Sequence, residues 1–507
     1  MKESLNKLKD KTRELMVLSN IGSVLGWDQQ TNLPEAGIAE RAEQITLIQA
    51  LHHDRITFPE IGELLEDLGC SDDAPGGTRD LDDVSRSYLR AVWREYSRAV
   101  KLPARLVTEL ARSASLSQAA WVKARQAKDY QAFAPHLDTL LKLNLEKARC
   151  LGYQDHPYDA LLDEYEPWMK TADLRRVFRD LRTYLQGLLA RISEAPQVDD
   201  VFLLKPYPVD RQEAFGRTVL ADMGFDLSRG RMDVSAHPFT TSLGCDDVRI
   251  TTRYNENFFK TSIFGIIHET GHALYELGYS QDIRGNILAQ GASLGIHESQ
   301  SRTWENLIGR SRAFWNHYLP RLKEYFPQQL SGIDMDDFYR GVNKVEPSLI
   351  RVEADEVTYN MHIILRFELE TALLEGNLTV ADLPLAWNDA MRDLLGVVPP
   401  SDAEGVLQDI HWSMGAFGYF PTYALGNLYG AQFFQRLRQE IPDLDRRIEQ
   451  GDLGCILAWL RENIHVAGSS KTATELLKEV TGKELSVEPF SRYLEEKYSD
   501  VYELSGM

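Results

Sequence analysis

The segment Ser262–Gly278 reads SIFGIIHETGHALYELG and contains the most informative pattern in the chain. His268 and His272 stand four residues apart, about one turn of an α-helix, so both imidazoles leave the same side of the helix and can share one ion. Glu269 lies roughly 100 degrees round the helix from His268, where it can touch a water on that ion without binding the ion. This H-E-x-x-H pattern is typical of zinc peptidases, which combine two neutral nitrogen ligands with a general base.

A chance coincidence is the alternative interpretation of this pattern. With 12 His among 507 residues, it should arise by chance on the order of one or two times in a hundred such chains. The flanking residues Ile266, Ile267 and Leu274 argue against chance, because they predict a buried helix. Two His and a Glu in a buried helix are costly unless something satisfies them. The pattern therefore predicts a metal site.

The composition is that of a globular protein with a sizeable core, since 43% of the 507 residues are hydrophobic and 26% are charged. No low-complexity linker divides the chain, so we expect a single domain over residues 1–507, with a helical N-terminal part (1–200) and a catalytic part (201–507). The formal charge of −20 argues against binding to nucleic acid or to an anionic membrane surface.

The sequence also bears on the compartment. No stretch approaches the roughly 18 apolar residues of a membrane span, and the first residues, MKESLNKLKDKTREL, lack the apolar core of a secretory signal. The four cysteines are scattered without a C-x-x-C pair, which is typical of reduced thiols that bind no metal. We therefore expect a cytoplasmic protein without a membrane partner.

Helical periodicity dominates the chain. Apolar residues between Leu5 and Ile21 recur at helical spacing, and a turn at Thr31–Pro34 precedes a second periodic segment (37–55), so the two predict a helical hairpin. Ser71–Asp80 is an exposed loop by composition. Strand character is found only at Val248–Tyr254, where a short edge strand could hold a substrate backbone. The fold class that these patterns indicate is mainly α, as one large helical domain with a small β element near the site.

Two capping-box patterns predict helix starts, one at Asp210 with Glu213 and one at Ser401 with Glu404. The C-terminal stretch is amphipathic, with apolar and aromatic residues at helical spacing, namely Phe490, Tyr493, Leu494 and Tyr498.

A catalytic zinc site usually has three protein ligands and one position for water, so we expect a third ligand. The extended motif H-E-x-x-H-x-x-G-x-x-H is excluded, because Tyr275 and Gly278 stand where it needs Gly and His. Glu276 lies eight residues from His268, about 12 Å along the helix axis, which is too far to share the ion. The best candidate is Glu298, which lies in a segment that is itself helical in period.

Two neighbours of Glu298 are alternatives. His297 could bind the ion instead, although three His ligands beside a free Glu298 are the weaker arrangement. Glu305 is the other alternative, but we interpret it as a surface carboxylate on a helix.

HETGH followed by HESQSR resembles the carboxypeptidase Taq family of zinc metallocarboxypeptidases. The resemblance extends in the same order over essentially the whole chain. The other segments that carry it are WDQQT from Trp27, YDALLDEYEP (Tyr158–Pro167), HPF (His237–Phe239), DVRIT (Asp247–Thr251), IRVEAD (Ile350–Asp355), GVLQDIHW (Gly405–Trp412) and GYFPTYALGN (Gly418–Asn427).

The resemblance implies a fold similar to the helical zinc oligopeptidases, with a deep active-site groove. It implies an enzyme that releases single amino acids from peptide C-termini with broad specificity, and that is a homodimer. The expected cofactor is one Zn²⁺ per chain, with Co²⁺ or another divalent ion as the alternative. His268, His272 and Glu298 would bind it, and Glu269 would act as the general base.

An exopeptidase also needs a cation for the terminal carboxylate of its substrate, and the planar fork of arginine suits that task. Arg249 and Arg351 lie in segments that the family uses for C-terminal recognition, and the resemblance favours Arg351. Each has another interpretation: Arg351 could form an i,i+4 ion pair with Asp355, and Arg249 could be an ordinary exposed charge.

By analogy with the family, Tyr423, His411 and His237 would contact the substrate or its tetrahedral intermediate. Alternatively, Tyr423 packs among aromatic rings, His411 is a core histidine, and His237 orients its loop.

Two other functions remain open at this point. One is an oligopeptidase or peptidyl-dipeptidase on the same fold. The other is an inactive helical scaffold, which would bind no stoichiometric metal.

Overall fold

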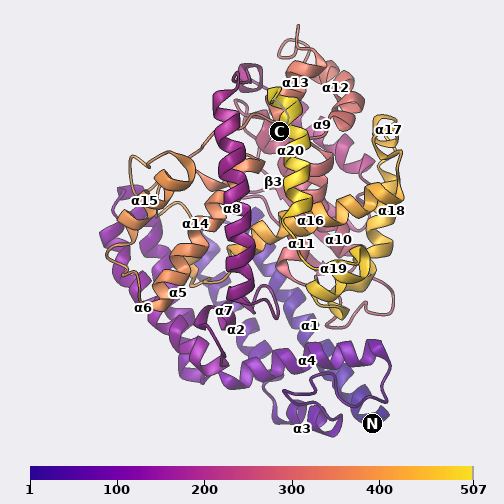
Figure 1. The fold of residues 1–507 in the computed structure, drawn as a ribbon. Helices are drawn as coiled ribbons and strands as arrows, with labels where there is room; N and C mark the ends of the chain where they lie inside the picture. Colours follow the sequence, from indigo (N-terminus) through magenta and orange to yellow (C-terminus); the bar gives the residue numbers. More distant parts are fainter. Residues whose placement is uncertain (505–507) are drawn as a thin grey trace. The chain divides into compact units, whose positions relative to one another are not determined.

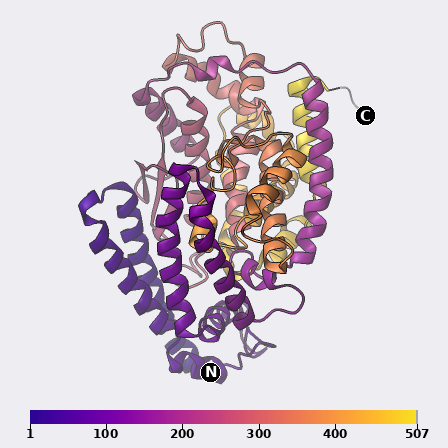
Figure 2. The same cartoon turned by 90° about the vertical axis from the view of Figure 1, so that its left-hand side faces the viewer.

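The computed structural model describes residues 1–504 and consists mainly of α-helices (Figures 1 and 2). Within these residues there are twenty α-helices and three β-strands, which confirms the predicted fold class. Contacts divide the chain into two compact units, each assembled from three separate segments. The first comprises residues 1–100, 199–342 and 433–484, and the second comprises 101–198, 343–432 and the chain from 485. The single domain with a boundary near residue 200 stays a prediction.

The first unit begins with the predicted helical hairpin. Helix α1 (Lys2–Thr31) packs against α2 (Ile38–Ile56), and the chain turns between them. The predicted loop at Ser71–Asp80 contains no helix or strand. The other helices of this unit are α3 (Pro59–Asp67), α4 (Asp83–Lys101, whose last residue falls in the second unit), α9 (Val209–Asp222), α10 (Phe259–Glu276), α11 (Leu294–Arg302), α12 (Arg312–Tyr325), α13 (Met335–Val342), α17 (Leu444–Glu449), α18 (Gly454–Asn463) and α19 (Ala473–Thr481).

A three-stranded sheet lies beside α10, with strand order β1-β3-β2. Strand β1 (Gly230–Val234) runs parallel to β3 (Asp247–Thr252), and β2 (Thr240–Gly244) runs antiparallel to β3. Only β3 was predicted, because β1 and β2 are short, contain glycine and lack a long β-branched run. The core between the sheet and the helices is formed by Leu220, Phe225, Met232, Val248, Ile250, Ile266, Ala273 and Leu277.

The second unit is also helical. Its final helix, α20 (Glu488–Tyr502), is amphipathic as predicted, with Phe490, Leu494 and Tyr498 buried. The other helices are α5 (Ala104–Ala127), α6 (Tyr130–Leu151), α7 (Pro157–Leu162), α8 (Thr171–Glu194), α14 (Glu356–Glu375), α15 (Leu383–Leu395) and α16 (Pro421–Glu440), which begins in this unit and ends in the first.

A helix does begin next to Asp210 as predicted, but neither of the two predicted capping boxes caps a helix. Helix α9 begins at Val209 behind Pro208 without a side-chain cap, so Asp210 is already inside its first turn. The hydroxyl of Ser401 lies 3.1 Å from a carboxylate oxygen of Glu404, yet residues 402–407 form consecutive turns rather than a helix. A local pair of residues can thus satisfy the pattern without the helix that the pattern predicts.

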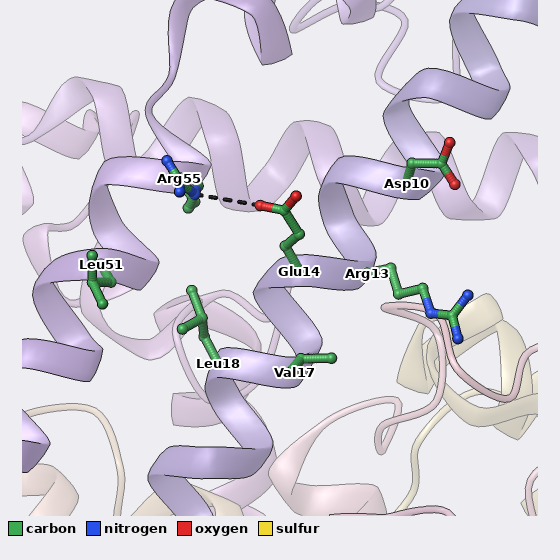
Figure 3. A pocket seen from close by; sticks show the side chains of 7 residues that line it. All are labelled: Asp10, Arg13, Glu14, Val17, Leu18, Leu51 and Arg55. Atoms are coloured by element: carbon green, nitrogen blue, oxygen red, sulfur yellow. Dashed lines mark ion pairs between the residues drawn. The ribbon is translucent and has the colours of Figure 1, made fainter.

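A pocket of about 430 Å³ opens along α1 and α2 in the first unit (Figure 3). It combines apolar residues such as Leu18 and Leu51 with charged ones, and Glu14 forms a 3.3 Å ion pair with Arg55 there. None of the predicted site residues lines it. Among the residues described, no helix is both long enough and apolar enough to cross a membrane.

Candidate metal centre

The site is built on α10 and α11, which pack against each other in the first unit. The apolar residues of α10 are buried, and the imidazoles of His268 and His272 lie side by side with their ring centroids 4.8 Å apart. Helix α11 begins at Leu294 and is capped by Ser293, whose hydroxyl accepts a 3.0 Å hydrogen bond from the backbone N–H of Ile296. This cap fixes where the helix that carries Glu298 begins.

Gly271 brings the two helices close together. A Cβ atom at this position would lie 2.7 Å from the Cα of Ser301 and 2.9 Å from the carbonyl oxygen of Gln300, which is closer than real Cβ contacts. The glycine between the two histidines of α10 therefore permits the approach of α11 that turns Glu298 toward them.

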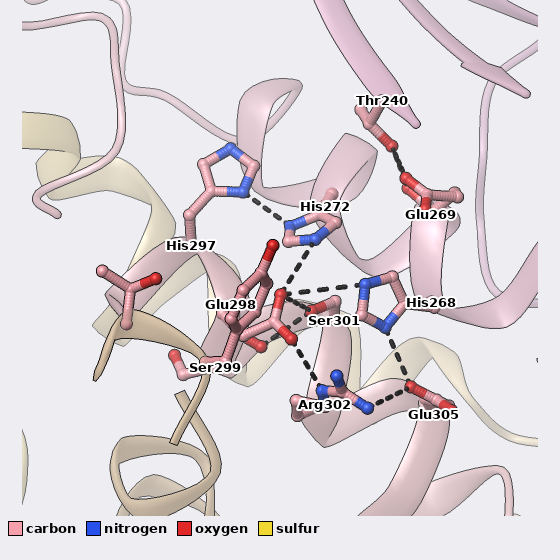
Figure 4. A network of polar contacts seen from close by, with 12 residues as sticks. Thr240, His268, Glu269, His272, His297, Glu298, Ser299, Ser301, Arg302 and Glu305 are labelled. Carbon is pink, nitrogen blue, oxygen red and sulfur yellow. Dashed lines mark hydrogen bonds and ion pairs between the residues drawn. The ribbon is translucent and has the colours of Figure 1, made fainter. Parts of the chain in front are cut away.

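The three predicted ligands converge (Figure 4). The Oε2 atom of Glu298 lies 3.7 Å from Nε2 of His268 and 3.4 Å from Nε2 of His272. Tetrahedral ligands at metal distances of 2.0–2.2 Å are about 3.3–3.6 Å from one another. The two distances to Glu298 are close to these values, and all three ligand atoms lie within 4.8 Å of one another. Their chemistry, two imidazoles and a carboxylate, fits a catalytic metal.

The charges of His272 and Glu298 suit a cation. Burial lowers the pKa of His272 to about 3, so its imidazole is neutral. Burial would raise the pKa of Glu298, but the neighbouring Arg302 and His268 outweigh it and hold this pKa well below its usual range. Glu298 is therefore an anion in the interior.

Glu269 lies beside the histidine pair without joining the group of candidate ligands. Its carboxylate accepts a 2.6 Å hydrogen bond from the hydroxyl of Thr240 on β2. Burial raises the pKa of Glu269, which is the environment expected for a carboxylate that takes up and releases a proton.

The interpretation of Glu305 as a surface carboxylate is wrong. Glu305 is buried in a π-helical turn (Thr303–Ile308), and its Oε2 atom lies 2.8 Å from Nδ1 of His268. Arg302 and Arg310 also donate hydrogen bonds to it, at 3.1 and 3.3 Å. Burial acts to raise the pKa of Glu305, but Arg302 and the other neighbours lower it to about 2. Glu305 therefore holds the orientation of the His268 imidazole.

His297 lies behind His272. Its Nδ1 atom is 2.6 Å from Nδ1 of His272, and its Nε2 atom is 2.7 Å from Oε1 of Glu276. Both ring nitrogens of His297 thus face partners other than Glu298, which leaves the Glu298 carboxylate as the third member of the group.

Arg351 lies in the second unit and is buried. Its Nε and Nη2 atoms donate to Oδ1 of Asp409 at 3.0 and 2.8 Å, and Nη1 donates to the hydroxyl of Tyr359 at 3.0 Å. The fully buried Arg366 on α14 donates to the other carboxylate oxygen of Asp409. One carboxylate therefore serves two guanidinium groups.

The alternative i,i+4 ion pair between Arg351 and Asp355 is not formed. Asp355 caps α14 by accepting hydrogen bonds from the backbone N–H groups of Val357 and Thr358. Arg351 belongs to a separate 3₁₀ turn, Arg351–Glu353, so no continuous helix presents the two side chains to each other.

Two other predicted residues accompany Arg351. Nε2 of His411 lies 3.1 Å from the hydroxyl of Tyr423, and the guanidinium carbon of Arg351 lies 4.9 Å from the centroid of the Tyr423 ring. Burial lowers the pKa of His411 to about 3, so it is neutral. The structure thus brings together three predicted substrate-binding residues of the second unit.

Arg249 and His237 belong to the first unit. The side chain of Arg249 is only 20% exposed, forms two hydrogen bonds of 2.9 and 2.8 Å to Asp247, and lies 4.3 Å from the ring centroid of Trp27. It is therefore not an ordinary exposed charge. His237 is exposed between β1 and β2, and its carbonyl accepts a 2.6 Å hydrogen bond from the hydroxyl of Ser235.

A helical fold, an H-E-x-x-H helix, a glutamate from a second helix and a buried carboxylate beside the histidine pair define a metallopeptidase. The chain belongs to the carboxypeptidase Taq (M32) metallopeptidase family, whose family model matches residues 7–498. The resemblance seen in the sequence is thereby confirmed, and so is the expected metallocarboxypeptidase activity. Membership of this family implies a bound divalent metal and peptide substrates.

Curated relatives match over nearly the whole chain. The chain is 46% identical to thermostable carboxypeptidase 1 of Thermus thermophilus and 38% identical to carboxypeptidase 1 of Bacillus subtilis, and in both cases the match covers 97% of each protein. It is also similar to the crystal structure of an M32 carboxypeptidase from Deinococcus radiodurans, with a TM-score of 0.95, 38% identity, and coverage of 99% of this chain and 100% of the other.

Proposed function

We propose that this metallocarboxypeptidase releases single amino acids from the C-termini of peptides with broad specificity, and that it uses one zinc ion bound by His268, His272 and Glu298. The observation that supports this most strongly is the convergence of three ligand atoms within 4.8 Å of one another beside a buried fourth group, Glu269. Zinc is favoured over cobalt or another divalent ion because neutral imidazoles with one carboxylate suit it and it is widely used in such sites.

Glu269 is the proposed general base. When bound, the ion lowers the pKa of a water ligand toward about 7 and polarises the scissile carbonyl. Glu269 then accepts a proton from the attacking water and passes it to the leaving amine. Thr240 holds the Glu269 carboxylate in place for both proton transfers, because its hydroxyl donates a 2.6 Å hydrogen bond to Oε2. The raised pKa of Glu269 makes the protonated form accessible between the two steps.

Arg351 is the proposed partner of the substrate's terminal carboxylate. Arg249 is matched one-to-one with Asp247, whereas Arg351 and Arg366 share the single carboxylate of Asp409. In the second cluster one carboxylate thus pairs with two guanidinium groups, and the carboxylate of a peptide would add a further anion beside them. Arg249 is the alternative.

Tyr423, His411 and His237 are the remaining proposed contacts. The ring of Tyr423 lies 4.9 Å from the guanidinium carbon of Arg351, and its hydroxyl lies 3.1 Å from Nε2 of His411. These donors would stabilise negative charge that develops on the scissile carbonyl or bind the substrate carboxylate. His237 is exposed on its loop and accessible to a peptide.

The proposed form is a cytoplasmic homodimer. All four cysteines are free thiols, which is usual in a reducing compartment. Cell fractionation and light scattering coupled to size-exclusion chromatography test the two parts of this proposal separately.

A peptide ladder followed by mass spectrometry tests the activity. Successive losses of one residue from the C-terminus are expected, and a C-terminally amidated copy of the same peptide should be cut far more slowly. Release of dipeptides would instead indicate a peptidyl-dipeptidase, and internal cleavage an oligopeptidase. A protein that cleaves nothing when loaded with zinc would be the inactive scaffold.

A further inference from the structure

The two candidate histidine ligands differ in what lies behind them (Figure 4). Nδ1 of His268 faces a carboxylate directly, that of Glu305 at 2.8 Å. Nδ1 of His272 faces another imidazole, that of His297 at 2.6 Å, and only beyond this ring is there a carboxylate, Glu276, at 2.7 Å. The second arrangement is a chain of three side chains rather than a pair.

The chemistry of imidazole decides where each proton in this chain lies. Nε2 of His272 faces Glu298 at 3.4 Å, and it must keep its lone pair to bind an ion, so the proton of this neutral ring is on Nδ1. That Nδ1–H donates to Nδ1 of His297, which must therefore accept. His297 then carries its own proton on Nε2 and donates a hydrogen bond from this N–H to Glu276. Each donor meets an acceptor, and two imidazoles with one proton each allow no other assignment.

The three hydrogen-bonded side chains, His272, His297 and Glu276, also join the two helices of the site. His272 and Glu276 are four residues apart on α10, whereas His297 precedes Glu298 on α11. His297, which directly precedes Glu298 on α11, thus contacts two residues on one face of α10. A shift of α11 would move Glu298 and His297 at the same time, so the chain couples the orientation of the His272 ring to the position of Glu298.

We propose that His297 and Glu276 are positioning residues of the metal site: they fix the tautomer and orientation of His272 and increase its basicity as a ligand. This inference rests on the proposed metal binding by His268, His272 and Glu298. Partners of this kind usually change metal affinity by about 10–100-fold when they are removed. The terminal carboxylate supplies the negative charge that polarises both rings.

Two substitutions at one position separate the hydrogen bond from the packing. H297F keeps a flat ring but removes the acceptor. H297N keeps an acceptor oxygen at the place of Nδ1 but does not extend to Glu276. Zinc affinity is measured by equilibrium competition with a chromogenic chelator on the full-length chain. We expect a loss of about 10–100-fold for H297F and a loss of less than tenfold for H297N. H317F, which changes a histidine on α12 that faces the carbonyl of Glu449 at 3.1 Å, is the matched control and should bind like the parent.

Three outcomes would overturn the proposal: H297F binding zinc as tightly as the parent, H297N binding as weakly as H297F, or H317F losing as much affinity as H297F. If H297F does not fold, E276A is the deciding variant, because it leaves both imidazole rings in place. It should weaken zinc binding by several-fold, and an unchanged zinc affinity would overturn the proposal. A parent that binds no zinc would overturn the proposed metal site as well, so the two failures are distinct.

A spectroscopic measurement detects the hydrogen bond between His272 and His297 without any catalytic assay. In the zinc-loaded parent, a downfield imidazole N–H resonance from His272 should appear in the proton spectrum, and it should be lost in H297F and regained in H297N. Its persistence in H297F would overturn the assignment of His297 as the acceptor.

Discussion

Replacement of Asp409 by Asn tests the charge balance of the Arg351 cluster. In the native protein its carboxylate accepts hydrogen bonds from two buried guanidinium groups, those of Arg351 and Arg366. Both arginines hold the pKa of Asp409 well below its usual range, even though burial acts to raise it. D409N keeps the shape of the side chain and removes its charge, so two buried guanidinium groups lose the carboxylate that they share.

The expected cost follows from the number of charges left behind. Removing one partner of a buried ion pair costs about 3–5 kcal/mol, and here two cations lose the same partner, so D409N should cost at least that much. R351M removes a cation instead and leaves Arg366 with Asp409 as a balanced pair. Its cost should be nearer that of lost hydrogen bonds, about 1–3 kcal/mol. The charge-balance account thus predicts that loss of the shared carboxylate is worse than loss of the proposed substrate-binding arginine.

Urea unfolding followed by tryptophan fluorescence measures both variants against the parent at pH 7. The comparison uses midpoints and slopes together, because a chain of two compact units need not unfold in one step. The reasoning would be refuted if R351M were destabilised as much as D409N or more. Substrate binding does not contribute to the measured stabilities, because no peptide is present.

Four further predictions concern the site and the core. E269Q should lower kcat by about 10²–10⁴-fold while zinc binding measured by chelator competition stays near that of the parent; loss of metal instead would assign Glu269 a different role. R351K should raise KM for peptides with a free C-terminus more than it lowers kcat, because the bidentate contact is lost; equal KM values would favour Arg249. G271A should weaken zinc binding, because the added methyl group pushes α11 and Glu298 away, and an unchanged affinity in competition assays would contradict this. Burial raises the pKa of Glu370 from 4.5 to about 7, so its contribution to stability is fully present below pH 4.5 and is lost as the pH rises through 7, roughly 3 kcal/mol in all. The difference in unfolding free energy between the parent and E370Q should therefore change by this amount between pH 4.5 and 7. A difference that does not depend on pH would contradict this prediction.

The pattern in α10 was readable because it is local. A spacing of four residues states which side chains share a helix face, and the period of the next apolar segment already placed Glu298 on a second helix. The contact that brings α11 close to α10 could not be predicted from the sequence, because no local pattern indicates that Gly271 packs against the backbone of Ser301.

Longer-range partners had no such signal. Asp409 and Arg351 are separated by 58 residues and by α14 and α15, so no periodicity connects them, although Asp409 stands two residues before His411 in the segment Gly405–Trp412. Glu305 was misjudged because its burial depends on the π-helical turn and on the two arginines that accompany it. The division into two interleaved units was also hidden, because the chain crosses between them without linker-like sequence.

The most direct measurement is a zinc titration of metal-free protein, in which release of single C-terminal amino acids is followed as the metal is added. Activity should be absent after chelation, rise in proportion to added zinc and stop rising at one equivalent per chain, and a protein with Glu298 replaced by Ala should neither bind zinc tightly nor gain activity. Full activity in the metal-free protein, or a plateau unrelated to one equivalent, would contradict the convergence of His268, His272 and Glu298 on a catalytic ion.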